Sequence, residues 1–172
     1  MLRPANIRFF PEPVLRAPCE TVKRFDSELL YCVNLLDVTM RAQKHGIGIA
    51  APQIGISKRV ALVDLSSRIP DAERYVLVNP EILEHGGVRL SREGCMSLPD
   101  YTADLRRYEW VRLKWQDELG HFHERRFEGI ESVCVQHEVD HLKGVLLLDR
   151  VACLKTDMYP RAVKDGKKRS IS

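Results

Sequence analysis

The first stretch with helical periodicity runs from Asp26 or Ser27 to about Lys44. Apolar side chains recur along it three or four residues apart, which places them on one face of a helix: Leu29, Leu30, Val33, Leu36 and Met40. Asp26 or Ser27 can cap the first turn, and Gly46 can end the helix in a left-handed conformation. The pattern therefore predicts a long N-terminal helix that packs by one face.

The middle of the chain is rich in β-branched and aromatic residues instead. Short runs of this kind occupy residues 60–63, 75–78 and 88–90. A hairpin is predicted from residues 110–115 and 122–127, which flank a polar turn at 117–120. We therefore expect this part of the chain to be mostly sheet.

A second helix is predicted over residues 129–142. Apolar residues and two histidines share one helical stripe there, namely Ile130, Val133, Cys134, His137 and His141. Gly144 follows the expected end of this helix. Three of its residues are valines, which are only moderate helix formers, so we expect packing rather than helix propensity to stabilise it. A last helix is predicted over residues 154–164, although Pro160 would have to break or kink it.

Composition places these elements in one domain. The 172 residues are 44% hydrophobic and 30% charged, which is typical of a single globular domain over residues 1–172. No run approaches the roughly 20 apolar residues that cross a bilayer, so no membrane span is expected. A net charge of +3 is too small to indicate direct nucleic-acid readout, and the basic cluster at residues 164–169 reads mainly as a solvated end.

The cysteines and the first residues indicate where the protein works. Five widely spaced cysteines do not form the pattern of a disulfide scaffold, so a reducing compartment is expected. Residues 1–8 lack the apolar core and cleavage site of a secretory signal. We therefore expect a cytoplasmic protein.

The strongest chemical motif is an HExxH element, His137-Glu138-Val139-Asp140-His141. One helical turn brings both imidazoles to the same face, so both can reach one ion, and Glu138 borders the open coordination position. This is the geometry of metal-assisted hydrolysis. The alternative is two ordinary histidines on a helix, so the motif needs a third ligand.

Cys95 is the best candidate for that third ligand. Downstream of the motif only Asp149, Asp157 and Asp165 are available, and their spacing matches no known pattern. Upstream, Glu93-Gly94-Cys95-Met96 sets a thiol beside a glycine, where backbone can approach closely. The alternative is a small buried residue, which is the role we expect for the other four cysteines: Cys19, Cys32, Cys134 and Cys153.

A third segment, residues 46–53, combines small and aliphatic residues with one amide. Its glycines and alanines let a peptide backbone lie against it, Ile47 offers an apolar wall, and the Gln53 amide can donate to a developing oxyanion. It has no Gly-Lys-Ser/Thr ending and so is no phosphate loop. By itself it could also be a tight turn.

Taken together and in this order, residues 46–53, 93–98 and 136–141 resemble the three signature motifs of the peptide deformylases, which remove the N-formyl group from new proteins. The resemblance extends across nearly the whole chain, from residues 11–16 to 141–150. Ile49 and Met96 stand where leucine is more usual. Thr102 stands where some members carry an arginine near the substrate.

The resemblance implies roles for these residues. Cys95, His137 and His141 would bind one divalent metal ion with water as fourth ligand, and Glu138 would be general base and acid. Gln53 and the backbone amide of Met96 would polarise the formyl oxygen. The ligand types alone favour zinc, whereas the family commonly uses ferrous iron and also works with nickel or cobalt.

We also expect an apolar slot for the substrate methionine. Ile47, Ile130, Val133 and Cys134 are positioned to line it, and the rest of the predicted substrate-binding set is Gly48, Glu93 and Gly94. Glu93 is expected to support the metal ligands from behind, and Arg106 or Arg107 could pair with a carboxylate there; the alternative is an exposed surface arginine.

The expected fold is α+β, with antiparallel sheets wrapped around the HExxH helix, the first long helix outside and a C-terminal segment. The expected partners are N-formylmethionyl nascent peptides and, through the basic tail, the ribosome; the protein is expected to act as a monomer. Two other functions stay open: a general HExxH peptidase, and a deformylase-like binding module without catalysis.

Overall fold

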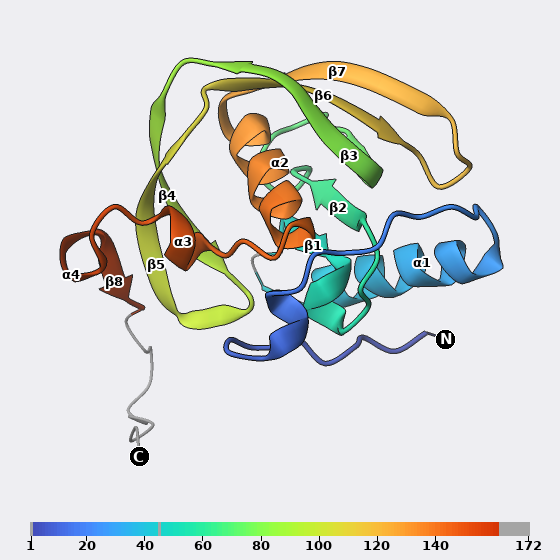
Figure 1. The fold of residues 1–172 in the computed structure, drawn as a ribbon, viewed down its shortest axis with the longest axis horizontal. Helices are drawn as coiled ribbons and strands as arrows, with labels where there is room; N and C mark the ends of the chain where they lie inside the picture. Colours follow the sequence, from blue (N-terminus) through green and yellow to red (C-terminus); the bar gives the residue numbers. More distant parts are fainter. Residues whose placement is uncertain (1, 45, 162–172) are drawn as a thin grey trace.

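A computed structural model describes residues 2–44 and 46–161 of the chain. Its two antiparallel sheets meet near helix α2 (Figure 1). The five-stranded sheet has the order β1-β2-β3-β6-β7, with bounds Gly48–Ala50, Val60–Asp64, Arg74–Gly86, Trp110–Gln116 and Phe122–Glu128. The three-stranded sheet has the order β4-β5-β8, with bounds Arg89–Cys95, Leu98–Arg107 and Met158–Pro160.

Helices are few. The two long ones are α1 and α2, with bounds Ser27–Arg41 and Gly129–Leu142, and the short ones are α3, α4 and the 3-10 turns η1 and η2, with bounds Leu147–Arg150, Leu154–Asp157, Pro13–Leu15 and Ala51–Ile54. The expected mixture of antiparallel sheets with few helices is therefore found. No helix among the described residues is long and apolar enough to cross a membrane.

Strand β2 shows how the two long helices share the larger sheet. All five of its residues are buried. Alternate side chains point to opposite faces of a strand. Ala61 and Val63 pack in the apolar cluster that includes α2, whereas Val60 and Leu62 pack in the cluster that includes α1. The sheet is thus covered on both faces near β1 and β2, which explains why the first four residues of this strand are all apolar.

Helix α1 begins as predicted but ends earlier. The Asp26 side chain accepts hydrogen bonds from the backbone N–H groups of Glu28 and Leu29, so Asp26 rather than Ser27 is the cap. The helix ends at Arg41 and its C-cap is Ala42. The left-handed cap expected at Gly46 is wrong, because Gly46 does not have a positive φ. A Cβ at Gly46 would lie 2.5 Å from the carbonyl oxygen of Met40, so close backbone approach explains the glycine.

The hairpin and the three predicted strands are present, but β1, β5 and β8 were not predicted from the sequence. β3 continues well beyond the predicted residues 75–78. The sequence did not indicate this extension, because the second half of the strand is mostly exposed and carries no buried apolar pattern. β5 was missed because its buried positions include Arg107, which hides the alternation of apolar residues. β1 has only three residues, too few for a visible period.

The C-terminal prediction of a helix over residues 154–164 is wrong. Helix α4 is four residues long, and the chain then forms β8, in which Tyr159 pairs with Thr102 of β5. Pro160 cannot continue a helix but fits the edge strand that it occupies. Residues 162–164 lie outside the described residues. α4 has no buried residue, and Cys153 before it is exposed, contrary to expectation, whereas the other four cysteines are buried.

Candidate metal centre and active site

Helix α2 carries the HExxH element. It spans the predicted residues, begins where Gly129 adopts a positive φ of 57°, and is followed by Gly144 with a φ of 72°. Ten of its fourteen residues are buried, which supplies the packing that its valines require. The rings of His137 and His141 lie with their centroids 5.0 Å apart, as expected for side chains one turn apart.

Cys95 reaches the histidines from the end of β4. The register of β4 against β5 shifts between Gly94 and Cys95, where the strand turns toward α2. The Cys95 Sγ atom lies 3.2 Å from Nε2 of His141, and one donor atom from each of Cys95, His137 and His141 lies within 4.8 Å of the others. Metal–sulfur bonds of about 2.3 Å and metal–nitrogen bonds of about 2.0 Å are compatible with such spacings.

The chemistry of these three donors also fits a divalent ion. Burial opposes ionisation of the thiol, but the imidazoles of His141 and His137 hold the pKa of Cys95 well below its usual value. The thiolate is the form that binds metals. On the His141 ring, Nε2 is the nitrogen that faces Cys95 and can offer its lone pair to the ion, whereas Nδ1 is buried without a hydrogen-bond partner among the described residues.

Glu93 orients His137 from the side opposite Cys95. A Glu93 carboxylate oxygen accepts a hydrogen bond of 2.9 Å from Nδ1 of His137, which leaves Nε2 for a ligand bond. Arg107 donates two hydrogen bonds of 2.7 and 2.9 Å to the same carboxylate. Burial raises the pKa of Glu93, but these hydrogen bonds outweigh it and lower the pKa to about 2. Of the two arginines considered from sequence, Arg107 is the partner.

Arg107 also joins Glu93 to Asp140 of the HExxH element. It donates a hydrogen bond of 2.6 Å to Asp140, and the exposed side of this carboxylate accepts two more from Arg150, of 2.6 and 3.0 Å. We call Glu93, Arg107, Asp140 and Arg150 the ion network. It runs from the back of His137 to the surface.

Glu138 has the opposite environment. Its side chain is buried, and the Oε2 atom has no hydrogen-bond partner among the described residues. Burial raises the pKa of Glu138 to about 7, although His137 and His141 act against this. The Oε1 atom lies against the backbone of Gly48 so closely that a Cβ at that position would overlap it. A carboxyl group with this pKa can both take up and release a proton near neutrality.

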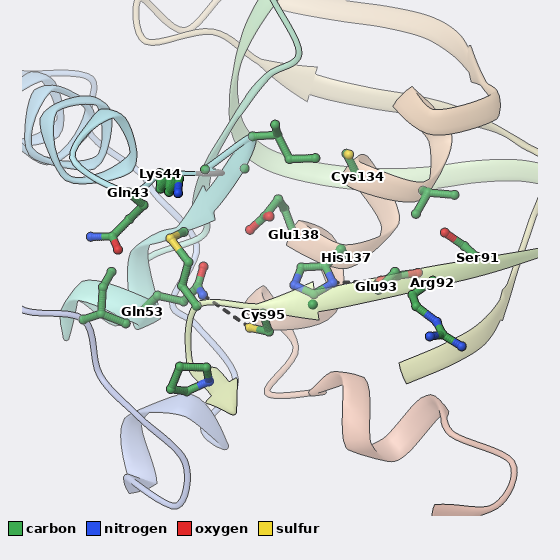
Figure 2. A pocket seen from close by; sticks show the side chains of 18 of the residues that line it. Gln43, Lys44, Gln53, Ser91, Arg92, Glu93, Cys95, Cys134, His137 and Glu138 are labelled. Atoms are coloured by element: carbon green, nitrogen blue, oxygen red, sulfur yellow. Dashed lines mark hydrogen bonds and ion pairs between the residues drawn. The ribbon is translucent and has the colours of Figure 1, made fainter. Parts of the chain in front are cut away.

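The side-chain amide of Gln53 is held in one orientation by the backbone of Ala50. Its Oε1 atom accepts a hydrogen bond of 2.9 Å from the N–H of Ala50, which directs the amide nitrogen into the site. That nitrogen lies 3.6 Å from Sγ of Cys95, the contact dashed in Figure 2, and 3.2 Å from Oγ of Ser97. The amide therefore offers N–H groups beside the three donor atoms.

A cavity of about 440 Å³ opens at these groups (Figure 2). Its wall includes all the residues predicted for catalysis and substrate binding and two of the three predicted metal ligands, namely Ile47, Gly48, Gln53, Glu93, Gly94, Cys95, Met96, Ile130, Val133, Cys134, His137 and Glu138. His141 is buried behind them. Thr102 does not line the cavity. It pairs with Tyr159 of β8, and Arg161, which directly follows β8, lines the cavity instead.

Several residues of the site were missed from the sequence. Ser97 and Asp140 lie inside the quoted motifs, but nothing in the motifs indicates their partners. Arg107 was one of the two arginines expected to pair with a carboxylate, but its second carboxylate partner, Asp140, was not predicted. No pattern in the sequence indicates that Arg150 joins the ion network or that Arg161 lies at the cavity.

Comparison with known proteins agrees with this geometry. The family model described as polypeptide deformylase matches residues 4–157. The chain is 43% identical over 164 residues to a peptide deformylase of Acidobacterium capsulatum, which covers 95% of each chain. It is 44% identical over 140 residues to one of Heliobacterium modesticaldum, covering 81% of this chain and 89% of the relative.

Solved structures give the same result. The crystal structure of the Thermotoga maritima peptide deformylase superimposes with a TM-score of 0.82 at 35% identity, covering 88% of this chain and all (100%) of the other. A Met-Ala-Ser-bound class I type b peptide deformylase from Acinetobacter baumannii has a TM-score of 0.82 at 34% identity, with coverage of 88% and 100%. The family match and these relatives show that the chain belongs to the peptide deformylase family, hydrolases that act on formyl-methionine peptides.

Proposed function

We propose that this chain is a metal-dependent hydrolase that removes the N-formyl group from the N-terminal formylmethionine of newly made proteins and releases formate. The observation that carries the proposal is a convergence in space. Gln53 and His141 lie 42 and 46 residues from Cys95 in sequence, yet the side chains of both contact its Sγ atom. Glu138, which has the pKa of a proton carrier, borders the same cavity.

Cys95, His137 and His141 would hold one divalent ion per chain. The ion would supply a nucleophile at neutral pH, because a divalent metal lowers the pKa of its water from about 15.7 toward 7. We propose Fe²⁺ as the ion in the cell, on the basis of family membership, with Zn²⁺, Ni²⁺ and Co²⁺ as other possible occupants. The thiolate and the two imidazoles suit each of these borderline ions.

Glu138 would move the proton. Its carboxylate accepts the proton of the attacking water and then donates it to the amine nitrogen, while the bond between formyl carbon and nitrogen breaks and formate leaves. Both tasks need a group that is ionised before attack and acidic after it. The unpartnered Oε2 atom and the raised pKa of Glu138 support this role.

Gln53 would polarise the formyl oxygen together with the backbone amide of Met96. Since Oε1 of Gln53 is held by Ala50, its nitrogen needs no reorientation when negative charge develops on the oxygen. Met96 lines the cavity next to Cys95, so its peptide group is close to the same position.

The substrate would lie as an extended strand between the two sheets. β1 and β4 are edge strands of their sheets, and both contribute to the cavity through Gly48 and Gly94. Free strand edges bind extended peptides through their backbone groups. The methionine side chain would enter the apolar slot formed by Ile47, Ile130, Val133 and Cys134. The A. baumannii relative was solved with Met-Ala-Ser bound, which supports a short peptide that begins with methionine as a ligand of this chain.

The remaining expectations become part of the proposal. We propose that residues 1–172 act as a single catalytic domain and as a monomer in the cytoplasm, with the antiparallel sheets around α2 holding the site and α1 outside it. The expected ribosome contact through residues 164–169 concerns a segment outside the described residues.

The test is formate release from formyl-Met-Ala-Ser by protein loaded separately with Fe²⁺, Zn²⁺, Ni²⁺ or Co²⁺. We expect turnover with about one ion per chain, loss of turnover with chelator, and much weaker metal binding in Cys95→Ser. Acetyl-Met-Ala-Ser should be nearly inert, because its extra methyl group would displace the carbonyl. Cleavage of internal peptide bonds would indicate a general peptidase, and binding without formate release would indicate a non-catalytic module.

A further inference from the structure

The mouth of the cavity carries positive charge that the hydrolysis itself does not use. Four exposed cationic side chains line it, namely Lys44, Arg68, Arg92 and Arg161. The two acidic residues in the lining, Glu93 and Glu138, are both buried. The exposed charge around the opening is therefore of one sign. We call these four side chains the cationic rim.

The cationic rim is assembled from four separate segments. Lys44 precedes β1, Arg68 follows β2, Arg92 belongs to β4 and Arg161 follows β8. In Figure 2, Lys44 and Arg92 lie on opposite sides of His137. A peptide that leaves the site between the two sheet edges therefore passes between positive charges.

Most of this charge is not neutralised by neighbouring carboxylates. Arg92 forms a bidentate ion pair with Asp104, of 2.7 and 2.9 Å, and lies over the ring of Tyr159. Within residues 2–44 and 46–161, no ion pair is formed by Lys44, Arg68 or Arg161. Three cations are thus available to a ligand.

Arg161 is the member closest to the path of a substrate. Its backbone N–H donates a hydrogen bond of 2.8 Å to the carbonyl of Asp100, and the β5–β8 pairing holds the residue before it. The guanidinium lies directly against Gly94, where a Cβ would overlap its Nη2 atom. A strand that runs along β4 from Cys95 reaches the level of Arg92 after three residues, or roughly 10 Å. The second and third residues of a peptide would therefore pass the guanidinium of Arg161.

We propose that the cationic rim selects formylmethionyl peptides with Asp or Glu as second or third residue, and that Arg161 is the main specificity-determining residue. The inference rests on the proposed function, whose substrate class it narrows. Cations around a cleft raise the local concentration of an anionic ligand and its association rate. The effect must weaken as salt screens the exposed charges.

The test compares kcat/KM for three amidated peptides: formyl-Met-Ala-Asp, formyl-Met-Ala-Ser and formyl-Met-Ala-Lys. Amidation removes the terminal carboxylate, which would otherwise engage the rim in all three. At low ionic strength we expect the Asp peptide to exceed the Lys peptide by about 5-fold, and 0.5 M salt should reduce the ratio to about 2-fold or less.

Arg161→Gln should reduce the logarithm of the Asp-to-Lys ratio of kcat/KM by at least half. The double variant Lys44→Gln, Arg68→Gln should remove most of the remaining preference. Lys114→Gln is the matched control, since it removes one exposed cation from the β6–β7 hairpin outside the cavity. Affinities for the deformylated products Met-Ala-Asp-amide and Met-Ala-Lys-amide, measured by calorimetry, should follow the same order without depending on turnover.

The outcomes separate the two proposals. If the Ser peptide is deformylated but the Asp-to-Lys ratio is near one, or is unchanged by Arg161→Gln, the charge selection is overturned and the proposed function stands. If no peptide releases formate from the metal-loaded protein, the proposed function is overturned and this inference with it.

Discussion

Helix α2 borders two buried groups of ionisable side chains that are built in opposite ways. In the ion network, Arg107 contacts the carboxylates of both Glu93 and Asp140, and Arg150 completes the outer end. At the cavity, beside Cys95 and His137, the buried Oε2 atom of Glu138 has no partner among the described residues.

The difference separates structural from chemical roles. A buried charge is costly unless it is paired and hydrogen-bonded, so a paired network has a strong preference for one arrangement. The ion network can therefore fix Glu93, and through it the ring of His137. The unpartnered oxygen of Glu138 gains a partner only when something else binds at the cavity, as expected of a group that meets a bound ligand.

The largest effect is expected from Glu138→Gln. Formate release should fall by about 10²- to 10⁴-fold, because positioned acid and base groups contribute this much. About one metal ion per chain should still bind, and the melting temperature should not fall, since no hydrogen bond to Oε2 is lost. Glu81→Gln is an exposed control. Turnover of Glu138→Gln close to wild type would refute its assigned role.

The second effect concerns Arg107→Met, which removes the centre of the ion network. Two buried carboxylates would each lose their buried guanidinium partner, and Asp140 would keep only Arg150, so the free energy of unfolding in urea should fall by about 3–5 kcal/mol. Metal affinity should also weaken, by about 10- to 100-fold, because Glu93 would no longer be held against His137. The control is Arg106→Met at the exposed neighbouring position. Equal stability of the two variants would show that the network does not hold the site.

A third change, Gly48→Ala, tests the cavity side without removing any functional group. Its Cβ would overlap Oε1 of Glu138 and displace the carboxylate, so kcat should fall by about 10²-fold. At Gly94 the same substitution would meet only the end of the exposed Arg161 side chain, which can move. We therefore expect Gly94→Ala to reduce kcat clearly less than Gly48→Ala does. Similar kcat values for both variants would mean that the position of Glu138 is not critical.

The smallest effect is expected from Arg150→Gln at the outer end of the ion network. The Arg150 side chain is 47% exposed, and Asp140 keeps its hydrogen bond to Arg107. Urea unfolding should show a loss of about 1 kcal/mol or less. A loss as large as that of Arg107→Met would mean that the surface arginine, and not the buried one, dominates the network.

Sequence patterns predicted the elements whose apolar residues face one way. α2 and the β6–β7 hairpin occupy almost the predicted residues: β6 alternates buried and more exposed side chains, the hairpin has a polar turn, and α2 lies between two glycines with positive φ, Gly129 and Gly144. β5 was missed because its inward residues include a charged one, and the last helix was wrong because strand pairing with β5 overrides the local preference.

The candidate site follows the same logic. Cys95, His137 and Glu138 are carried by short dense motifs, so their types and spacing were informative, and all three lie at the cavity. Arg107 lies outside any motif and was named only as an alternative to Arg106, whereas Arg150 and Arg161 were not named. The places of these arginines depend on partners brought together only by the folded sheets, and a linear pattern does not contain that information.

The contact between Cys95 and His141 also links metal supply to folding. An unfolded chain separates these residues by 46 positions, so the complete donor set exists only after β4 and α2 have docked. An ion that binds only the folded chain adds RT ln(1 + [M]/Kd), which is about 4.1 kcal/mol at a thousandfold excess over Kd. The melting temperature of this protein should therefore rise with the concentration of free metal ion around it.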